Sequence, residues 1–178
     1  MDGDPVEHVA LVRQLELDLA IVMGATEWQG CDTKHLWSEQ LFVALWNDHP
    51  KSRHRKLSWP DIVSEIFIIG EAAQGREFLD RLRERLKTFA EVPMIDTQNV
   101  GSDNLLSLVA LGHGLTLVNE TRAVFPFPGV VFRPVQDETI PFSAVWSPSN
   151  DNPALRRLIS MAKFLSRNVA APAKTSES

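Results

Sequence analysis

The sequence is poor in the features that mark secreted, membrane-spanning and nucleic-acid-binding proteins. Its single cysteine, Cys31, excludes an internal disulfide and any multi-cysteine metal site, and it is compatible with a reducing compartment. The 18 basic and 23 acidic side chains give a formal net charge of -5, so this chain by itself should bind nucleic acid poorly. Acids stand where a secretory signal would be basic, and no stretch approaches the ~20 apolar residues of a membrane span. We therefore expect a cytoplasmic protein with no membrane partner.

The sequence also lacks the motifs of catalysis and metal binding. The five histidines show neither the HExxH pattern nor a paired ligand spacing, and no Gly-x-Ser-x-Gly motif is present. Cys31 has no neighbouring signature of a nucleophile. A pair of carboxylates brought together by folding would escape this search, which leaves enzymatic activity as a minor alternative. We expect a protein that is not an enzyme, with no catalytic residues, no metal and no cofactor.

What the sequence does contain is a regular alternation of helix and strand patterns, of which the amphipathic segment 76–89 is the clearest helix. The apolar, β-branched segment 17–23 is typical of a buried parallel strand. This alternation predicts an α/β protein. Strands are predicted at 17–23, 41–46, 67–69, 94–100, 115–118, 129–135 and 140–146, and helices from Asp4, at 76–89, from Ser102 and from Asn152.

Residues 105–120 read LLSLVALGHGLTLVNE and place a Gly-His-Gly motif between two apolar segments. A phosphate-binding loop has the order strand, glycines, helix, so that the phosphate meets a helix N-terminus. Here the order is reversed, because a helix that Ser102 is expected to cap precedes the glycines and a strand follows them. Gly112 stands where a left-handed residue would end the helix. We therefore expect the glycines to turn the chain and to let helix and strand approach closely.

The order of several segments is more specific than any one of them. In chain order they read LVRQLELDLAIV, EQLFVALWNDHP, LSWPDIVSEIFII, SLVALGHGLTLV and GVVFRPV, followed by a C-terminal helix. This ordered set, from about Val6 to Phe164, resembles the effector-binding (substrate-binding) domain of LysR-type transcriptional regulators. The resemblance implies a type II periplasmic-binding-protein-like fold, in which two crossover strands join two α/β lobes. The first lobe would comprise 1–37 and 122–167, the second lobe 38–121, and 168–178 would be a frayed tail.

Two parts that such regulators normally have are missing from the sequence. The first lobe lacks its initial strand, helix and strand and is therefore expected to be incomplete, and no helix-turn-helix DNA-binding domain precedes it. A fragment, a misassigned start and a truncated product all remain open as explanations. The isolated chain should expose apolar surface, and be less stable or self-associate. The family context implies a homo-oligomer that contacts DNA only through the missing domain.

The effector site is expected beyond the carboxyl ends of the strands, where ligands of open α/β sheets bind. The free amides of the helix that begins at Ser102 can accept a carboxylate, although capping alone is an equally good role for this serine. A carboxylate or an aromatic acid is the effector that the resemblance implies. The candidate effector-binding residues are Val22, Met23, Gly24, Ala25, Ile69, Gly70, Glu71, Asn99, Val100, Gly101 and Ser102.

Two functions from different classes follow. In the first, the chain is the small-molecule effector-sensing domain of a LysR-type transcriptional regulator and transmits ligand binding to a DNA-binding domain outside this chain. In the second, it is a stand-alone solute-binding module, or a truncated dimerisation partner, without DNA-binding activity. The coding sequence upstream of Met1 would discriminate between them.

Overall fold

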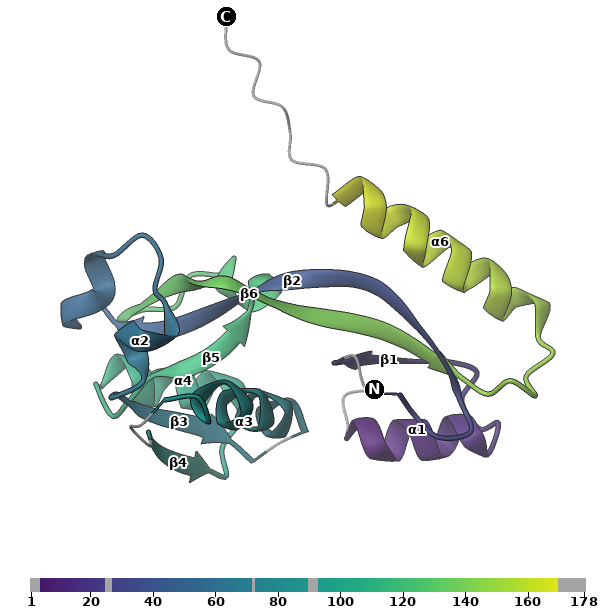
Figure 1. The fold of residues 1–178 in the computed structure, drawn as a ribbon, viewed down its shortest axis with the longest axis horizontal. Coiled ribbons are helices and arrows are strands. Elements are labelled where there is room, and N and C mark those ends of the chain that lie inside the picture. The colour runs from purple at the N-terminus through teal and green to yellow at the C-terminus, as the bar shows by residue number, and fades with distance from the viewer. Residues whose placement is uncertain (1–3, 25–26, 72, 90–92, 170–178) are drawn as a thin grey trace, which may run out of the picture. The chain divides into compact units, whose positions relative to one another are not determined.

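The computed structural model describes residues 4–24, 27–71, 73–89 and 93–169 and confirms the α/β class (Figure 1). Helices and strands alternate along most of the chain, as the sequence predicted. The elements are α1 (Pro5–Arg13), β1 (Ala20–Met23), β2 (Asp32–Trp46), the 3-10 helix η1 (Pro50–Arg53), α2 (Trp59–Ile62), β3 (Ile66–Gly70), α3 (Ala73–Leu86), β4 (Met94–Gln98), α4 (Ser102–Ala110), β5 (Thr116–Asn119), α5 (Glu120–Ala123), β6 (Val130–Trp146) and α6 (Pro153–Val169).

The chain forms two compact units. Unit 1 comprises Glu39–Ile140 together with Asp4, and unit 2 comprises Pro5–Ser38 together with the chain from Pro141 onward. The long strands β2 and β6 are neighbours in one sheet, and each passes from one unit into the other (Figure 1). From Pro5 onward the chain therefore crosses between the units twice, both times within a strand.

Unit 1 is built around β3, a buried apolar strand. β4 pairs with β3 in parallel, with Ile66 opposite Met94 and Gly70 opposite Gln98. On its other side β3 is joined to Leu115, just before β5, because the Ile68 amide donates to the Leu115 carbonyl at 2.8 Å. β5 in turn pairs antiparallel with β2. Both α3 and α4 pack against β3 (Figure 1). The shared core consists of Ala44, Ile68, Leu105, Leu106, Val109, Val118 and Val130.

The glycines of the Gly-His-Gly motif have the predicted structural role. Gly112 has φ +79°, and the amides of Gly112 and His113 donate to the carbonyls of Val109 and Leu108, which is the hydrogen-bond pattern of a Schellman C-cap. A Cβ atom on Gly114 would lie 2.8 Å from the Ile66 carbonyl oxygen, so only glycine lets the chain pass this close to β3. The motif ends α4 and leads into β5.

Unit 2 contains α1, β1, α6 and the remaining parts of β2 and β6. Its core includes Val9, Val12, Ala20, Val22 and Val145. The prediction of a buried parallel strand over 17–23 was wrong in two respects. β1 has only four residues, and it pairs antiparallel with the end of β6. Among the described residues, none of the helices is both long and apolar enough to cross a membrane.

Candidate functional site: an apolar pocket in unit 1

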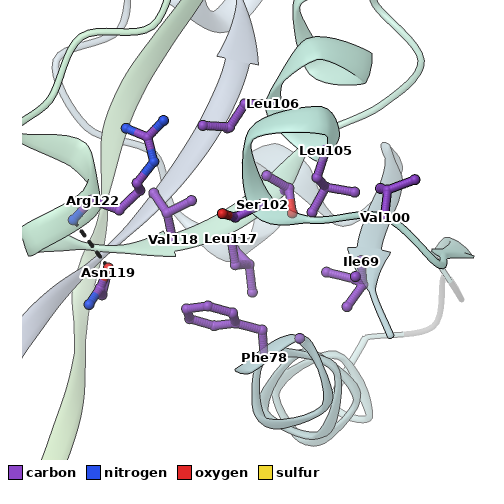
Figure 2. A pocket seen from close by; sticks show the side chains of 13 residues that line it. Ile69, Phe78, Val100, Ser102, Leu105, Leu106, Leu117, Val118, Asn119 and Arg122 are labelled. Carbon is purple, nitrogen blue, oxygen red and sulfur yellow. Dashed lines mark hydrogen bonds between the residues drawn. The ribbon is translucent and has the colours of Figure 1, made fainter. Parts of the chain in front are cut away.

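A pocket of about 140 Å³ lies in unit 1 where the carboxyl ends of its strands meet the start of α4 (Figure 2). Its walls are mostly apolar. The side chains of Phe78, Leu117 and Ile69 line the pocket, and the first turn of α4 faces into it. The lining residues are Ile69, Gly70, Gly75, Phe78, Val100, Ser102, Leu105, Leu106, Thr116, Leu117, Val118, Asn119 and Arg122.

The topology of the sheet explains why the pocket forms at this edge. β3 and β4 are parallel, and the bridge between Phe67 and Leu115 is also parallel. The carboxyl ends of β3, β4 and β5 therefore point the same way, and the chain leaves β4 directly into α4. Such an edge is the usual ligand-binding position in open α/β sheets.

A close contact between two glycines sets one wall of the pocket. Gly75, in the first turn of α3, packs directly on the carbonyl group of Gly70 at the end of β3. A Cβ atom at position 75 would lie 1.8 Å from that carbonyl oxygen. The absence of a side chain therefore allows α3 to approach β3 and brings Phe78, one turn further on, to the pocket.

The start of α4 differs from the prediction in its capping. Gly101, not Ser102, occupies the N-cap position, and no side chain caps the helix. Ser102 is the first helical residue and lines the pocket. The prediction that Ser102 caps the helix was wrong because the preceding glycine takes the extended cap conformation. The amides of the first helical turn, ahead of the Leu105-to-Gly101 hydrogen bond, have no partner within the helix.

The predicted effector-binding residues divide into three groups. Ile69, Gly70, Val100 and Ser102 line the pocket in unit 1. Their neighbours Glu71, Asn99 and Gly101 are not among the lining residues, and the Glu71 amide donates to the Gln98 carbonyl.

Val22, Met23 and Gly24 belong to unit 2, whereas Ala25 lies outside the described residues. Val22 is a core residue. Gly24 has φ +108° and donates its amide to the Pro141 carbonyl at 2.8 Å. A role of this group in effector binding stays a prediction.

Sequence reasoning missed Arg122, a charged residue at the pocket. It comes from the short helix α5, in a segment with no recognisable binding motif. Its backbone amide donates to the Asn119 side chain, which caps α5 and fixes the position of Arg122 (Figure 2). The only available signal was a basic residue shortly after the buried strand β5, and that alone does not distinguish a binding residue from a solvated one.

A buried carboxylate ties α3 to β6 and α2. Glu138 accepts hydrogen bonds from the Trp59 indole at 2.9 Å and from Arg81 at 3.2 Å, and its other ion pair is with Arg85 at 2.8 Å. Trp59 lies in α2, and the two arginines lie one turn apart in α3. Helix α3, which carries the pocket residues Gly75 and Phe78, is thus anchored at its other end.

A carboxyl group in α3 itself has one buried oxygen atom without a hydrogen-bond partner among the described residues. This is Glu77, whose Oε2 atom has no donor within reach. Burial, and then the nearby carboxylates of Asp4 and Asp80, raise the pKa of Glu77 to about 7. The described residues hold no group of three or more His, Cys, Asp or Glu side chains suited to a metal ion.

The fold and the pocket define a small-molecule-binding α/β domain. A family model described as LysR substrate binding domain matches residues 1–164, and the chain belongs to that family. It is thus an effector-binding domain of the LysR type, with a type II periplasmic-binding-protein-like fold, as the resemblance implied.

Curated relatives match it at moderate identity. XapR of Escherichia coli strain K12, an HTH-type transcriptional regulator, is 26% identical over 159 residues, which are 87% of this chain and 53% of XapR. CysL of Bacillus subtilis strain 168, also an HTH-type transcriptional regulator, is 26% identical over 83 residues, 46% of this chain and 28% of CysL. The chain therefore spans about half the length of XapR.

Solved structures of the same kind share the fold at lower identity. The effector-binding domain of BenM with its effector benzoate superposes with a TM-score of 0.77 at 16% identity, covering 98% of this chain and 82% of that one. CbnR, a LysR family transcriptional regulator, gives a TM-score of 0.75 at 16% identity and covers 92% of this chain and 57% of CbnR. The regulatory domain of OxyR from Pseudomonas aeruginosa gives 0.73 at 18% identity, covering 91% and 79% of the two chains.

Proposed function

We propose that this chain is the effector-sensing part of a LysR-type transcriptional regulator that works in the cytoplasm and not as an enzyme. The matched relatives XapR and CysL are regulators, and XapR is about twice as long as the matched segment. CbnR, which shares the fold, has been seen in complex with its target DNA. In the proposed regulator, a helix-turn-helix domain outside this chain contacts DNA, and the protein works as a homo-oligomer.

The observation that carries the proposal is the apolar pocket at the strand ends of unit 1. Its volume of about 140 Å³ is close to the roughly 150 Å³ of an engineered apolar cavity that takes up benzene. The part of the effector that this pocket holds is therefore small, about the size of one ring or a short branched chain. Two domains of similar fold hold a small ligand: the BenM domain holds its effector benzoate, and the regulatory domain of CcmR from Synechocystis holds 2-PG.

A carboxylate-bearing metabolite or an aromatic acid is the effector class we propose. Polar groups that suit it are the Ser102 hydroxyl and the free amides at the start of α4, which carry the positive end of the helix dipole. We propose that units 2 and 1 are the first and second lobes of the family fold. Effector binding would favour one arrangement of the regulator over another and so change how the regulator contacts DNA.

The test is a thermal-shift screen of small metabolites on this chain, followed by calorimetry of the compounds that stabilise it. The matched variants are Val100→Phe, which adds a ring to the pocket wall, and Leu111→Phe, which adds the same ring at an exposed position. We expect Val100→Phe to abolish the shift that a stabilising compound produces and Leu111→Phe to preserve it. The assignment of the pocket fails if Val100→Phe binds the compound as tightly as the unaltered chain.

A further inference from the structure

Arg122 is the single charged residue among the thirteen described residues that line the pocket (Figure 2). Its guanidinium donates to the Phe125 carbonyl at 3.1 Å, and it lies over the rings of Phe127 and Phe132, 5.7 and 5.9 Å from their centroids. A carbonyl oxygen and two ring faces hold the group in place. None of these three partners carries a formal negative charge, so they fix the cation without neutralising it.

Among the described residues, one carboxylate forms an ion pair with this guanidinium, that of Asp103, and it is a weak partner. Asp103 Oδ1 lies 3.4 Å from the Arg122 Nη2 atom, well beyond the ~2.7–2.9 Å of a strong charge-assisted hydrogen bond. The Asp103 side chain is 81% exposed, whereas that of Arg122 is only 24% exposed. Because solvent screens such an exposed partner, the pair contributes little and can be exchanged for a better one.

We propose that Arg122 selects the effector by charge, by pairing with a small monoanion that has a compact apolar body, in exchange for Asp103. This inference rests on the proposed function, since it concerns the ligand of the same pocket. A monoanion is favoured because the lining residues supply one cation and no Asp or Glu. A cationic ligand would meet repulsion, and a neutral one would gain only an ordinary hydrogen bond from the guanidinium, which is weaker than a charge-assisted one.

The rest of the pocket fits the same ligand. Walls formed by Ile69, Phe78 and Leu117 exclude water from the apolar body, and a charge pair is stronger where water is excluded. The start of α4 at Ser102 adds partial positive charge on the same side as the anion. The carboxylate of an acid and the amide of its neutral isostere have nearly the same shape, so comparing the two keeps the shape nearly constant while the negative charge is removed.

The experiment measures, by isothermal titration calorimetry with the 178-residue chain, the affinities of three matched pairs. These are benzoate and benzamide, cyclohexanecarboxylate and cyclohexanecarboxamide, and 4-methylvalerate and 4-methylvaleramide. We expect at least one acid to bind more tightly than its amide. Arg122→Met should weaken the binding of that acid roughly tenfold to a hundredfold and the binding of its amide only severalfold at most. Asp103→Asn should tighten the acid roughly twofold to fivefold, because it removes the competing carboxylate.

Two controls separate charge selection from folding. Arg53→Met removes one positive charge from an exposed position of unit 1 and should leave the preference for the acid intact. Arg122→Lys should retain part of it, since the charge stays but the planar fork is lost. If Arg122→Met does not fold, Asp103→Asn still tests the exchange, because the inference predicts tighter acid binding for that variant.

The outcomes distinguish this inference from the proposed function. An acid-to-amide ratio that is the same in Arg122→Met as in the unaltered chain overturns the role of Arg122. Binding of the amides in preference to the acids also overturns it, but leaves the pocket as a small-molecule site. If none of the six probes binds and a wider screen of small molecules finds no ligand, the pocket itself is wrongly assigned and both proposals fall.

Discussion

Gly75 lies in the first turn of α3, where the helix meets the carbonyl group of Gly70. An alanine is ordinarily better than glycine inside a helix, by about 1 kcal/mol. Here the order should invert, because a Cβ atom would lie 1.8 Å from the Gly70 oxygen. We expect Gly75→Ala to lower the free energy of unfolding by about 2 kcal/mol or more in urea titrations.

Gly70→Ala at the same junction is the matched control. Its Cβ atom would meet the Val100 oxygen at 3.7 Å and Leu105 at 3.9 Å, which are ordinary contacts. We expect its unfolding midpoint to stay close to that of the unaltered chain. If Gly75→Ala is as stable as Gly70→Ala, α3 is not in direct contact with the end of β3.

Glu77 should make stability depend on pH in a defined direction. Its folded-state pKa of about 7 lies above its ordinary value of 4.5. Between these values the folded chain binds more protons at this site than the unfolded chain does, so the contribution of Glu77 to stability falls as pH rises. Glu77→Gln carries no charge and should exceed the unaltered chain in stability at pH 8 by up to about 2 kcal/mol, with the advantage shrinking towards pH 5.

Chemical denaturation at pH 8 and at pH 5 measures this difference. Glu84→Gln, an exposed position of the same helix, should change stability by a similar small amount at both values. An advantage of Glu77→Gln that is equal at pH 5 and pH 8 would show that folding does not raise the pKa of Glu77.

Four of the predicted site residues reach the pocket because the rule behind them is topological. Ile69 and Gly70 end one strand, and Val100 and Ser102 follow another, so any parallel pair of strands brings them to one edge. Phe78 and Arg122 obey no such rule, since their positions depend on how α3 and α5 pack. Packing of this kind depends on contacts between segments far apart in the chain, such as Gly75 on Gly70, which no local pattern reveals.

At the scale of elements, β6 shows where local signals mislead. The sequence predicted two strands, at 129–135 and 140–146, with the polar segment 136–139 between them. The structure has a single strand over Val130–Trp146. Its irregularity lies at Asp137, which has φ +57°, and the Gln40 side chain donates to the carbonyls of Val135 and Glu138 on either side. A side chain from β2 thus satisfies backbone groups that a regular ladder would have paired.

The buried Glu138 network should stabilise the packing of α3 on β6. Glu138→Gln keeps the shape but removes the charge from beside Arg81 and Arg85. Breaking a fully buried pair costs roughly 3–5 kcal/mol, and we expect a smaller loss of about 2 kcal/mol, because the Arg85 side chain is half exposed. The measurement is the free energy of unfolding in urea.

Asp137→Asn, next along the strand, serves as its control. Position 137 is exposed, and asparagine tolerates a positive φ at least as well as aspartate. This variant should therefore be as stable as the unaltered chain or slightly more so. Equal stabilities for Glu138→Gln and Asp137→Asn would mean that the carboxylate of Glu138 does not hold α3.

At the scale of the whole molecule, the sequence predicted the α/β class, the type II fold and the family through the order of its segments. The order survives because each buried strand and each glycine turn keeps its place along the chain, as SLVALGHGLTLV does in ending α4 and starting β5. The predicted parallel pairing of β1 was wrong, because an apolar strand has the same sequence pattern whether its neighbour runs parallel or antiparallel.

The apolar stripe of α6 bears on how whole molecules associate. Leu158, Met161 and Leu165 follow one another at helical spacing, and each is more than half exposed, as is Phe164. Contiguous apolar surface of this kind promotes association. We expect the 178-residue chain to self-associate in sedimentation velocity as its concentration rises, and to do so at high salt as well, because burial of apolar surface is not screened.

The double variant Leu158→Gln with Leu165→Gln keeps good helix formers on α6 but removes two apolar side chains from the stripe. It should sediment as a monomer over the range in which the unaltered chain associates. Arg156→Gln with Arg157→Gln changes two exposed residues of the same helix and should leave association intact. A monodisperse monomer for the unaltered chain would refute the prediction, because an exposed stripe with no effect on association is not acting as a contact surface.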